Sequence, residues 1–129
     1  MNTPSTSVPD DPEKVVQRQL EAYNAHDLDG LLATYAADAQ QFEHPSTLLA
    51  SGLAQLRERF AIRFQEPNLH AALIKRIVMG DLVIDHERVS RTFAEGPGQI
   101  ELVAMYRVRQ GKIETAWFIS GAQTLDAPG

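Results

Sequence analysis

Cysteine is absent from the 129-residue sequence. Disulfide bonds, thiolate nucleophiles and cysteine-ligated zinc sites are therefore excluded. The absence of cysteine also fits a cytoplasmic protein, which is the location that we expect.

Long apolar runs are missing as well. No segment approaches the ~20 consecutive apolar residues that a membrane helix requires, so we expect no membrane partner. Residues 1–11 have neither a basic start nor an apolar stretch, and they do not predict a signal peptide.

Positive charge is scarce. The chain has 12 lysines and arginines against 17 aspartates and glutamates, which gives a formal net charge of −5. Proteins that bind nucleic acids use cationic groups to neutralise phosphates. Because basic residues here form only short pairs such as Lys75-Arg76, we expect no nucleic-acid partner.

The composition is that of one globular domain. The hydrophobic fraction of 43% and the charged fraction of 22% are ordinary values, and the length suits one hydrophobic core. We expect the domain over residues 12–121, with a disordered tail at residues 1–11 and a second tail at residues 122–129.

The first half of the chain has helical periodicity. A helix is expected to begin near Pro12, and Asp27 is placed to cap a short second helix. A third helix is expected over residues 52–65, where Pro67 ends the pattern. Between the last two helices, the sequence predicts a short strand over residues 39–43 and then a loop over residues 46–51.

The second half has strand periodicity. Turn signals at Gly80-Asp81, residues 95–98 and Gln110-Gly111 separate the expected strands. These strands are residues 69–79, 82–93, 99–109 and 113–120. Three consecutive hairpins make an antiparallel meander, and the helices are the only cover for its apolar face. The expected class is therefore α+β, with a curved antiparallel sheet packed against three N-terminal helices.

This order of elements resembles the NTF2-like superfamily, which includes SnoaL-like and ketosteroid-isomerase-like domains. Residues 22–31 resemble the bend between its first two helices, residues 35–39 the exit from the second, and residues 111–113 the approach to the last strand. The similarity covers about residues 12–120. It implies a cone-shaped domain with one pocket for a small hydrophobic molecule and no cofactor. It leaves the activity open, because this fold hosts isomerases, cyclases, hydrolases and inert binding modules.

The resemblance also suggests a catalytic base. Ketosteroid isomerases carry an Asp-Pro pair after the second helix, and this aspartate is their proton-transferring base. The matching stretch here is residues 42–45, in which His44 takes the position of the aspartate. The positions of their two oxyanion donors match Gln19 and Ala104. Because Ala104 has no side-chain donor, we do not expect steroid isomerase activity.

Histidine suits the role that the resemblance gives to His44. Its unperturbed pKa of ~6.5 leaves it neutral at pH 7, and burial in an apolar pocket would lower the pKa further. The alternative is structural: the imidazole only forms a hydrogen bond with the loop that follows Pro45.

Residues 84–90 supply two further candidates. Strand alternation puts Ile84, His86, Arg88 and Ser90 on one face, and the resemblance points that face into the cavity. Arg88 is then expected to bind a carboxylate or an oxyanion, with His86 beside it. A register shifted by one residue would instead place both side chains in solvent or at a dimer contact. No close pairing of histidines indicates a metal site, and we expect none.

The rest of the pocket wall is expected to be apolar and aromatic. The predicted substrate-binding side chains are Tyr23, Phe60, Phe64, Ile84, Leu102, Ala104, Tyr106 and Phe118. The opposite face of the sheet carries Val103, Met105, Trp117 and Ile119. This second group is too apolar for a free surface and suits a homodimer formed sheet to sheet.

Two functions remain open from the sequence. The first is a cofactor-independent isomerase, cyclase or hydratase that acts on a small hydrophobic molecule, with His44 as the general base. The second is a non-catalytic module that binds a small molecule or a partner. The sequence does not decide between them.

Overall fold

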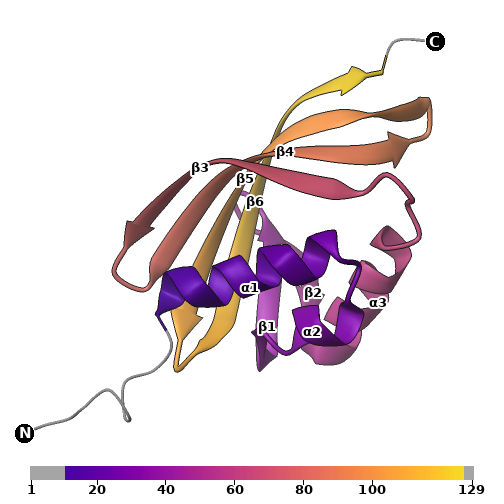
Figure 1. The fold of residues 1–129 in the computed structure, drawn as a ribbon. Helices are drawn as coiled ribbons and strands as arrows, with labels where there is room; N and C mark the ends of the chain where they lie inside the picture. Colours follow the sequence, from indigo (N-terminus) through magenta and orange to yellow (C-terminus); the bar gives the residue numbers. More distant parts are fainter. Residues whose placement is uncertain (1–10, 127–129) are drawn as a thin grey trace, which may run out of the picture.

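The computed structural model describes residues 11–126, which form three helices and a six-stranded sheet (Figure 1). The elements are α1 (Pro12–Asn24), α2 (Leu28–Leu32), β1 (Tyr35–Glu43), β2 (Thr47–Ser51), α3 (Leu53–Arg63), β3 (His70–Met79), β4 (Leu82–Phe93), β5 (Gly96–Arg109) and β6 (Lys112–Leu125). The predicted α+β class is confirmed. Residues 1–10 and 127–129, which belong to the predicted tails, lie outside the described part of the chain.

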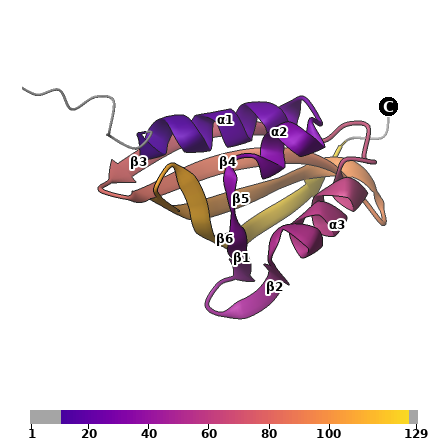
Figure 2. The same cartoon turned by 90° about the horizontal axis from the view of Figure 1, so that it is seen from below.

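The strands follow the order β2-β1-β6-β5-β4-β3. β3 to β6 form the predicted antiparallel meander, whereas β1 pairs with β6 in parallel. The sheet is curved, and α1 lies across one of its faces, with α3 next to β1 and β2 (Figures 1 and 2). Side chains of α1, α3 and the concave face of the sheet line a hollow between them.

Local signals fix the helix starts. Asp11 caps α1, because its Oδ1 accepts a hydrogen bond of 2.9 Å from the amide of Glu13. Asp27 caps α2 in the same way, through the amide of Gly30 at 3.0 Å. α3 has no side-chain cap; Gly52 precedes it with a φ of 87°, a conformation that favours glycine.

Four strand boundaries differ from the sequence predictions. β2 occupies most of the segment predicted as a loop, β1 begins at Tyr35, and β5 begins at Gly96, within a predicted turn. β6 continues to Leu125, so the part of the predicted tail up to that residue is strand. These segments are strands because their backbones pair with neighbouring strands, although many of their side chains are not buried. Leu48 in β2 is 51% exposed, and the residues of β6 from Ile119 onward are exposed, so neither segment shows an apolar alternation.

Candidate functional site

The hollow contains a cavity of about 320 Å³, which lies within the range typical of small-molecule sites. Its apolar lining is Leu20, Leu49, Phe60, Ala71, Val89, Ile100, Leu102 and Phe118, together with the rings of Tyr23 and Tyr106. Its polar lining is Gln19, Gln41, Glu43, Arg59, Arg63, Glu87, Arg91 and Ser120. Every helix and strand except α2 contributes to this wall.

Five of the eight predicted substrate-binding residues line the cavity: Tyr23, Phe60, Leu102, Tyr106 and Phe118. Phe64 packs behind them, with its ring 5.7 Å from that of Tyr23. Ala104 is fully buried between Leu102 and Tyr106 on the inward face of β5. Ile84 lies on the opposite face of the sheet, so its predicted place in the pocket is wrong.

β4 turns the other set of its side chains inward. Asp85 pairs with Ala104, and Glu87 pairs with Leu102, both of which are inward residues of β5. Because directly paired residues share a face, Asp85, Glu87 and Val89 point toward the helices and are buried. The prediction that His86 and Arg88 face the cavity is therefore wrong.

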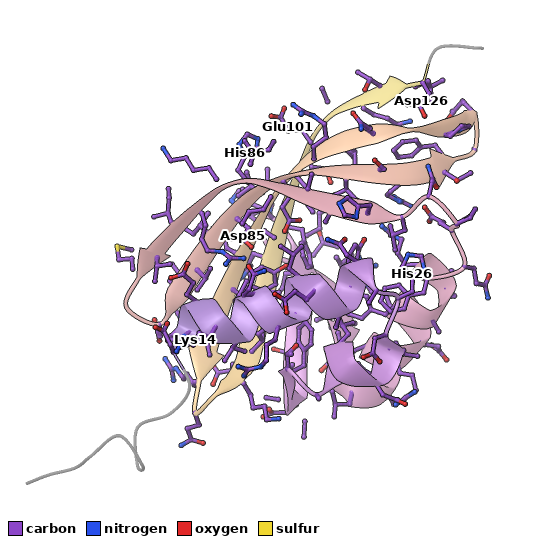
Figure 3. All side chains as sticks on the ribbon, viewed as in Figure 1. Lys14, His26, Asp85, His86, Glu101 and Asp126 are labelled. Carbon is purple, nitrogen blue, oxygen red and sulfur yellow. The ribbon has the colours of Figure 1, made fainter. Side chains whose placement is uncertain are left out.

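His86 and Arg88 lie on the outer face. The Nε2 of His86 is 2.7 Å from the Oε2 of Glu101, and both side chains are partly exposed. Figure 3 shows this pair on the side of the sheet away from α1, while Asp85 points toward α1. Arg88 is exposed and pairs with Glu101 across the strands. Neither residue can contact a molecule inside the cavity.

His44 lies just beyond the end of β1 and is exposed. Its backbone amide donates a hydrogen bond of 2.9 Å to the carbonyl of Phe118. The cavity lining includes its neighbour Glu43 but not His44 itself. The role of His44 as a base stays a prediction, and the cavity contains a different titratable group.

A buried ion pair occupies the space between the sheet and α1. Arg76 donates to both oxygens of Asp85, at 2.7 and 2.9 Å, and to the Oε1 of Gln17 at 2.9 Å. The side chains of Arg76 and Asp85 are only 9% and 1% exposed. The hydrogen bonds with Asp85 raise the pKa of Arg76, although burial opposes them. Asp85 thus has a cationic partner inside the protein.

Glu87 is the next inward residue of β4 and has no such partner. Its residue is 4% exposed, and no group within residues 11–126 donates a hydrogen bond to its carboxyl. Burial, reinforced by the charge of Asp85, raises the pKa of Glu87 to about 8, although Arg76 opposes the shift. Two neighbouring carboxyls therefore differ: Asp85 is paired with a guanidinium, whereas Glu87 lacks such a partner and is mainly protonated at pH 7.

Two tyrosines of the lining keep their hydroxyl protons. Burial raises the pKa of Tyr106 well above its usual value, and the nearby Glu87 adds to the effect. Burial also raises the pKa of Tyr23 to about 12. Both phenols can donate a hydrogen bond to a ligand oxygen.

Three arginines add positive charge to the wall. Arg91 donates two hydrogen bonds to Glu66, at 3.2 and 2.9 Å, and Arg63 lies 3.6 Å from the same carboxylate. Burial would raise the pKa of Glu66, but the hydrogen bonds from Arg91 and the Thr92 amide outweigh burial and lower it. Arg59 instead donates from Nε to the Oε1 of Gln41 at 3.1 Å.

Other site types find no support in the described part of the chain. Within residues 11–126, no three histidine, aspartate or glutamate side chains gather in a way that could hold a metal ion. None of the helices described there has the length and apolarity needed to cross a membrane.

Glu87, Arg59 and Gln41 were not among the site residues predicted from the sequence. For Glu87, the length of the loop between β4 and β5 decides the face, and the predicted strands, residues 82–93 and 99–109, left five residues between them and therefore the opposite parity. Phe93 pairs with Gly96, so two residues separate the strands. A hairpin with an even number of loop residues pairs odd positions with even ones. Because the even-numbered residues of β5 point inward, the odd-numbered residues of β4, which pair with them, also point inward.

Comparison with known proteins agrees with the fold. Residues 16–115 match the family described as the SnoaL-like domain. No curated protein sequence matches the chain. An uncharacterised protein of cystatin fold from Novosphingobium aromaticivorans is 23% identical, with a TM-score of 0.79 over 85% of this chain and 98% of its own. IdmH from Streptomyces antibioticus, named as a candidate polyketide cyclase, is 22% identical, with a TM-score of 0.73 over 86% and 92% of the two chains.

Proposed function

Because the chain belongs to the SnoaL-like domain family, we propose that its cavity binds a small molecule with an apolar body and catalyses proton transfer on it, with Glu87 as the acid–base group. The reaction class is isomerisation or intramolecular cyclisation without a cofactor. The observation that carries the proposal is a buried carboxyl, with its pKa raised to about 8, in the wall of a cavity that also has an apolar and aromatic lining.

The chemistry follows from that pKa. A general base works best when its pKa lies near the working pH, and an ordinary carboxylate is too weak to take a proton from carbon efficiently. The ionised form of Glu87 would remove a proton from the carbon next to a ketone. The enolate oxygen would accept a hydrogen bond from Tyr106, which lines the same cavity.

Two outcomes then return the enzyme to its starting state. In an isomerisation, the protonated Glu87 gives the proton back to another carbon of the enolate. In a cyclisation, the enolate carbon attacks a second carbonyl of the same molecule, and Glu87 protonates the resulting alkoxide. The apolar residues of the lining would hold the body of the substrate.

The structural neighbours fit this reaction class. IdmH is named as a candidate polyketide cyclase, and a protein of Jannaschia with a TM-score of 0.71 and 17% identity as a candidate SnoaL-like polyketide cyclase. At these identities the neighbours support the fold alone. The case for proton transfer in this chain depends on its own Glu87.

Hydrogen exchange at carbon tests the proposal. In D₂O, the protein is expected to speed deuterium incorporation next to the carbonyl of small aromatic ketones such as 2-tetralone. The rate should rise with pH and level off above about pH 8, as Glu87 ionises. Glu87→Gln should lower the rate by about 10²-fold or more. NMR of the ketone gives the rate.

His44→Ala is the matched control, because His44 does not line the cavity. We expect it to exchange like the unmodified protein. Equal rates for the unmodified protein and Glu87→Gln would refute the role of Glu87. Ligand binding without any exchange would favour the non-catalytic binding module. Loss of exchange in His44→Ala alone would return the base to His44.

The outer face of the sheet supports a separate proposal, a homodimer. We propose that a second copy of this chain packs on the apolar row that runs across the strands. The row consists of the paired residues Ile77, Ile84, Met105 and Trp117, with Val103 and Ile119 beside it. Lys75, Arg88 and Glu101 flank it with charges of both signs, so that a two-fold arrangement can bring opposite charges together.

Trp117→Glu tests the homodimer. A glutamate in the middle of an apolar interface would lack a partner, so the variant is expected to be a monomer at concentrations where the unmodified protein is a dimer. Sedimentation velocity measures the mass. Ile62→Glu is the control, since Ile62 is 66% exposed and lies on α3, outside the row. A monomeric unmodified protein would contradict the proposal.

A further inference from the structure

The cavity is positively charged in a chain that is negative overall. The formal net charge of the protein is −5. The wall, however, contains three arginines, Arg59, Arg63 and Arg91, and only two carboxyls, those of Glu43 and Glu87; Glu66, which pairs with Arg63 and Arg91, is not part of the lining. Glu87 is mainly protonated at pH 7, because its pKa is raised to about 8. Anions are therefore favoured in this cavity over neutral molecules of the same shape.

Arg59 differs from the other two arginines. Arg63 and Arg91 share the carboxylate of Glu66, which offsets much of their charge. Within residues 11–126, no carboxylate lies within 4 Å of the guanidinium of Arg59. Burial, and next the like charge of Arg63, lower the pKa of Arg59, which nevertheless remains a cation. A half-buried cation without an anion is the group that an anionic ligand would stabilise.

A hydrogen bond with Gln41 holds the side chain of Arg59 in place. Its Nε donates to the Oε1 of Gln41 at 3.1 Å, and the Nε2 of Gln41 is 3.4 Å from the hydroxyl of Tyr35. Gln41 is fully buried, so this support is rigid. The terminal nitrogens of Arg59 have no hydrogen-bond partner within residues 11–126. A planar carboxylate can accept two parallel hydrogen bonds from one guanidinium.

We propose that the ligand of this cavity is an aromatic carboxylic acid whose carboxylate binds the guanidinium of Arg59. Its apolar body lies against the apolar part of the lining, which includes Leu20, Ile100, Leu102 and Phe118. This inference names the substrate class for the proton-transfer site proposed above and rests on that proposal. The charge on Arg59 would also orient the ligand relative to Glu87.

A pair of isosteric compounds tests the ligand class. 2-Naphthoate and 2-naphthamide have the same ring system and differ mainly in charge. In titration calorimetry at pH 7, the protein is expected to bind the naphthoate at least about tenfold more tightly than the amide. Arg59→Gln should remove this preference by weakening the naphthoate alone.

The control is Arg57→Gln. Arg57 lies on the same helix, but it is exposed, pairs with Asp29 at 2.9 Å and does not line the cavity. We expect this variant to keep the preference for the naphthoate. Thermal melting of both variants checks that the fold is intact. Equal affinities for the two compounds, an unchanged preference in Arg59→Gln, or no binding of the naphthoate at millimolar concentration would each overturn the proposal.

The two proposals fail in different ways. Binding of the naphthoate that depends on Arg59, together with no deuterium exchange in any ketone, would remove the catalytic role and keep the anion site. Exchange that depends on Glu87, together with equal affinities for the acid and the amide, would keep the catalytic role and remove the anion site.

Discussion

Replacing Arg76 with methionine is expected to lower the free energy of unfolding by about 3–5 kcal/mol. Asp85 is 1% exposed, and Arg76 supplies both of its close hydrogen bonds. Without that guanidinium, a carboxylate would remain in the interior with neither water nor a counter-ion. Urea denaturation at pH 7 measures the loss.

Two variants give this prediction its controls. Arg57→Met breaks the exposed pair with Asp29 and should cost at most about 1 kcal/mol. Arg76→Met combined with Asp85→Leu removes both buried charges, and it should recover much of the stability lost in the single variant. A single variant within about 1 kcal/mol of the unmodified protein would show that the pair contributes little.

The stability of the protein is expected to fall as pH rises, because of Glu87. The carboxyl titrates near ~4.3 in the unfolded chain, whereas its pKa is about 8 in the folded protein. Between these values, the folded state keeps a proton that the unfolded state has released. Each unit of increasing pH therefore lowers the free energy of unfolding by up to about 1.4 kcal/mol through this group. Below ~4.3 and above about 8 its contribution is constant.

Glu87→Gln should remove this slope. The amide has nearly the same shape and does not ionise, so the variant should be closest to the unmodified protein near pH 5 and clearly more stable near pH 8. Urea midpoints measured across this range give the comparison. Glu58→Gln, an exposed position on α3, controls for the loss of one acidic residue. Parallel pH curves for the unmodified protein and Glu87→Gln would contradict the shifted pKa.

The fold could be predicted from the sequence, because in most helices and strands the apolar residues recur at the spacing of one buried face. The inward residues of β5 alternate cleanly, from Ile100 to Val108. In β4 the two faces resemble each other: the inward set includes Asp85 and Glu87, and the outward set includes Ile84 and His86. Charged residues on the buried face removed the contrast that a strand pattern needs. The error in the predicted site came from this one strand.

Tertiary contacts account for the rest of what was missed. A bulge between Leu73 and Lys75 shifts the alternation of β3, so that Arg76 pairs with Asp85 on the inward face. Gln41 on β1 and Arg59 on α3 meet only after the helix has packed against the sheet. No local period or short motif marks either event, so neither could be predicted from one sequence.

The sheet can close only late in synthesis, because the last strand in the chain lies in its interior. β6 lies between β1 and β5 and pairs with both, so it joins the β1–β2 pair to the rest of the sheet. Until the ribosome releases it, β1 and β5 both present open backbone edges, which favour association between nascent chains. Arg59, Gln41 and Glu87 have by then been made, but the wall that brings them around one hollow is not closed.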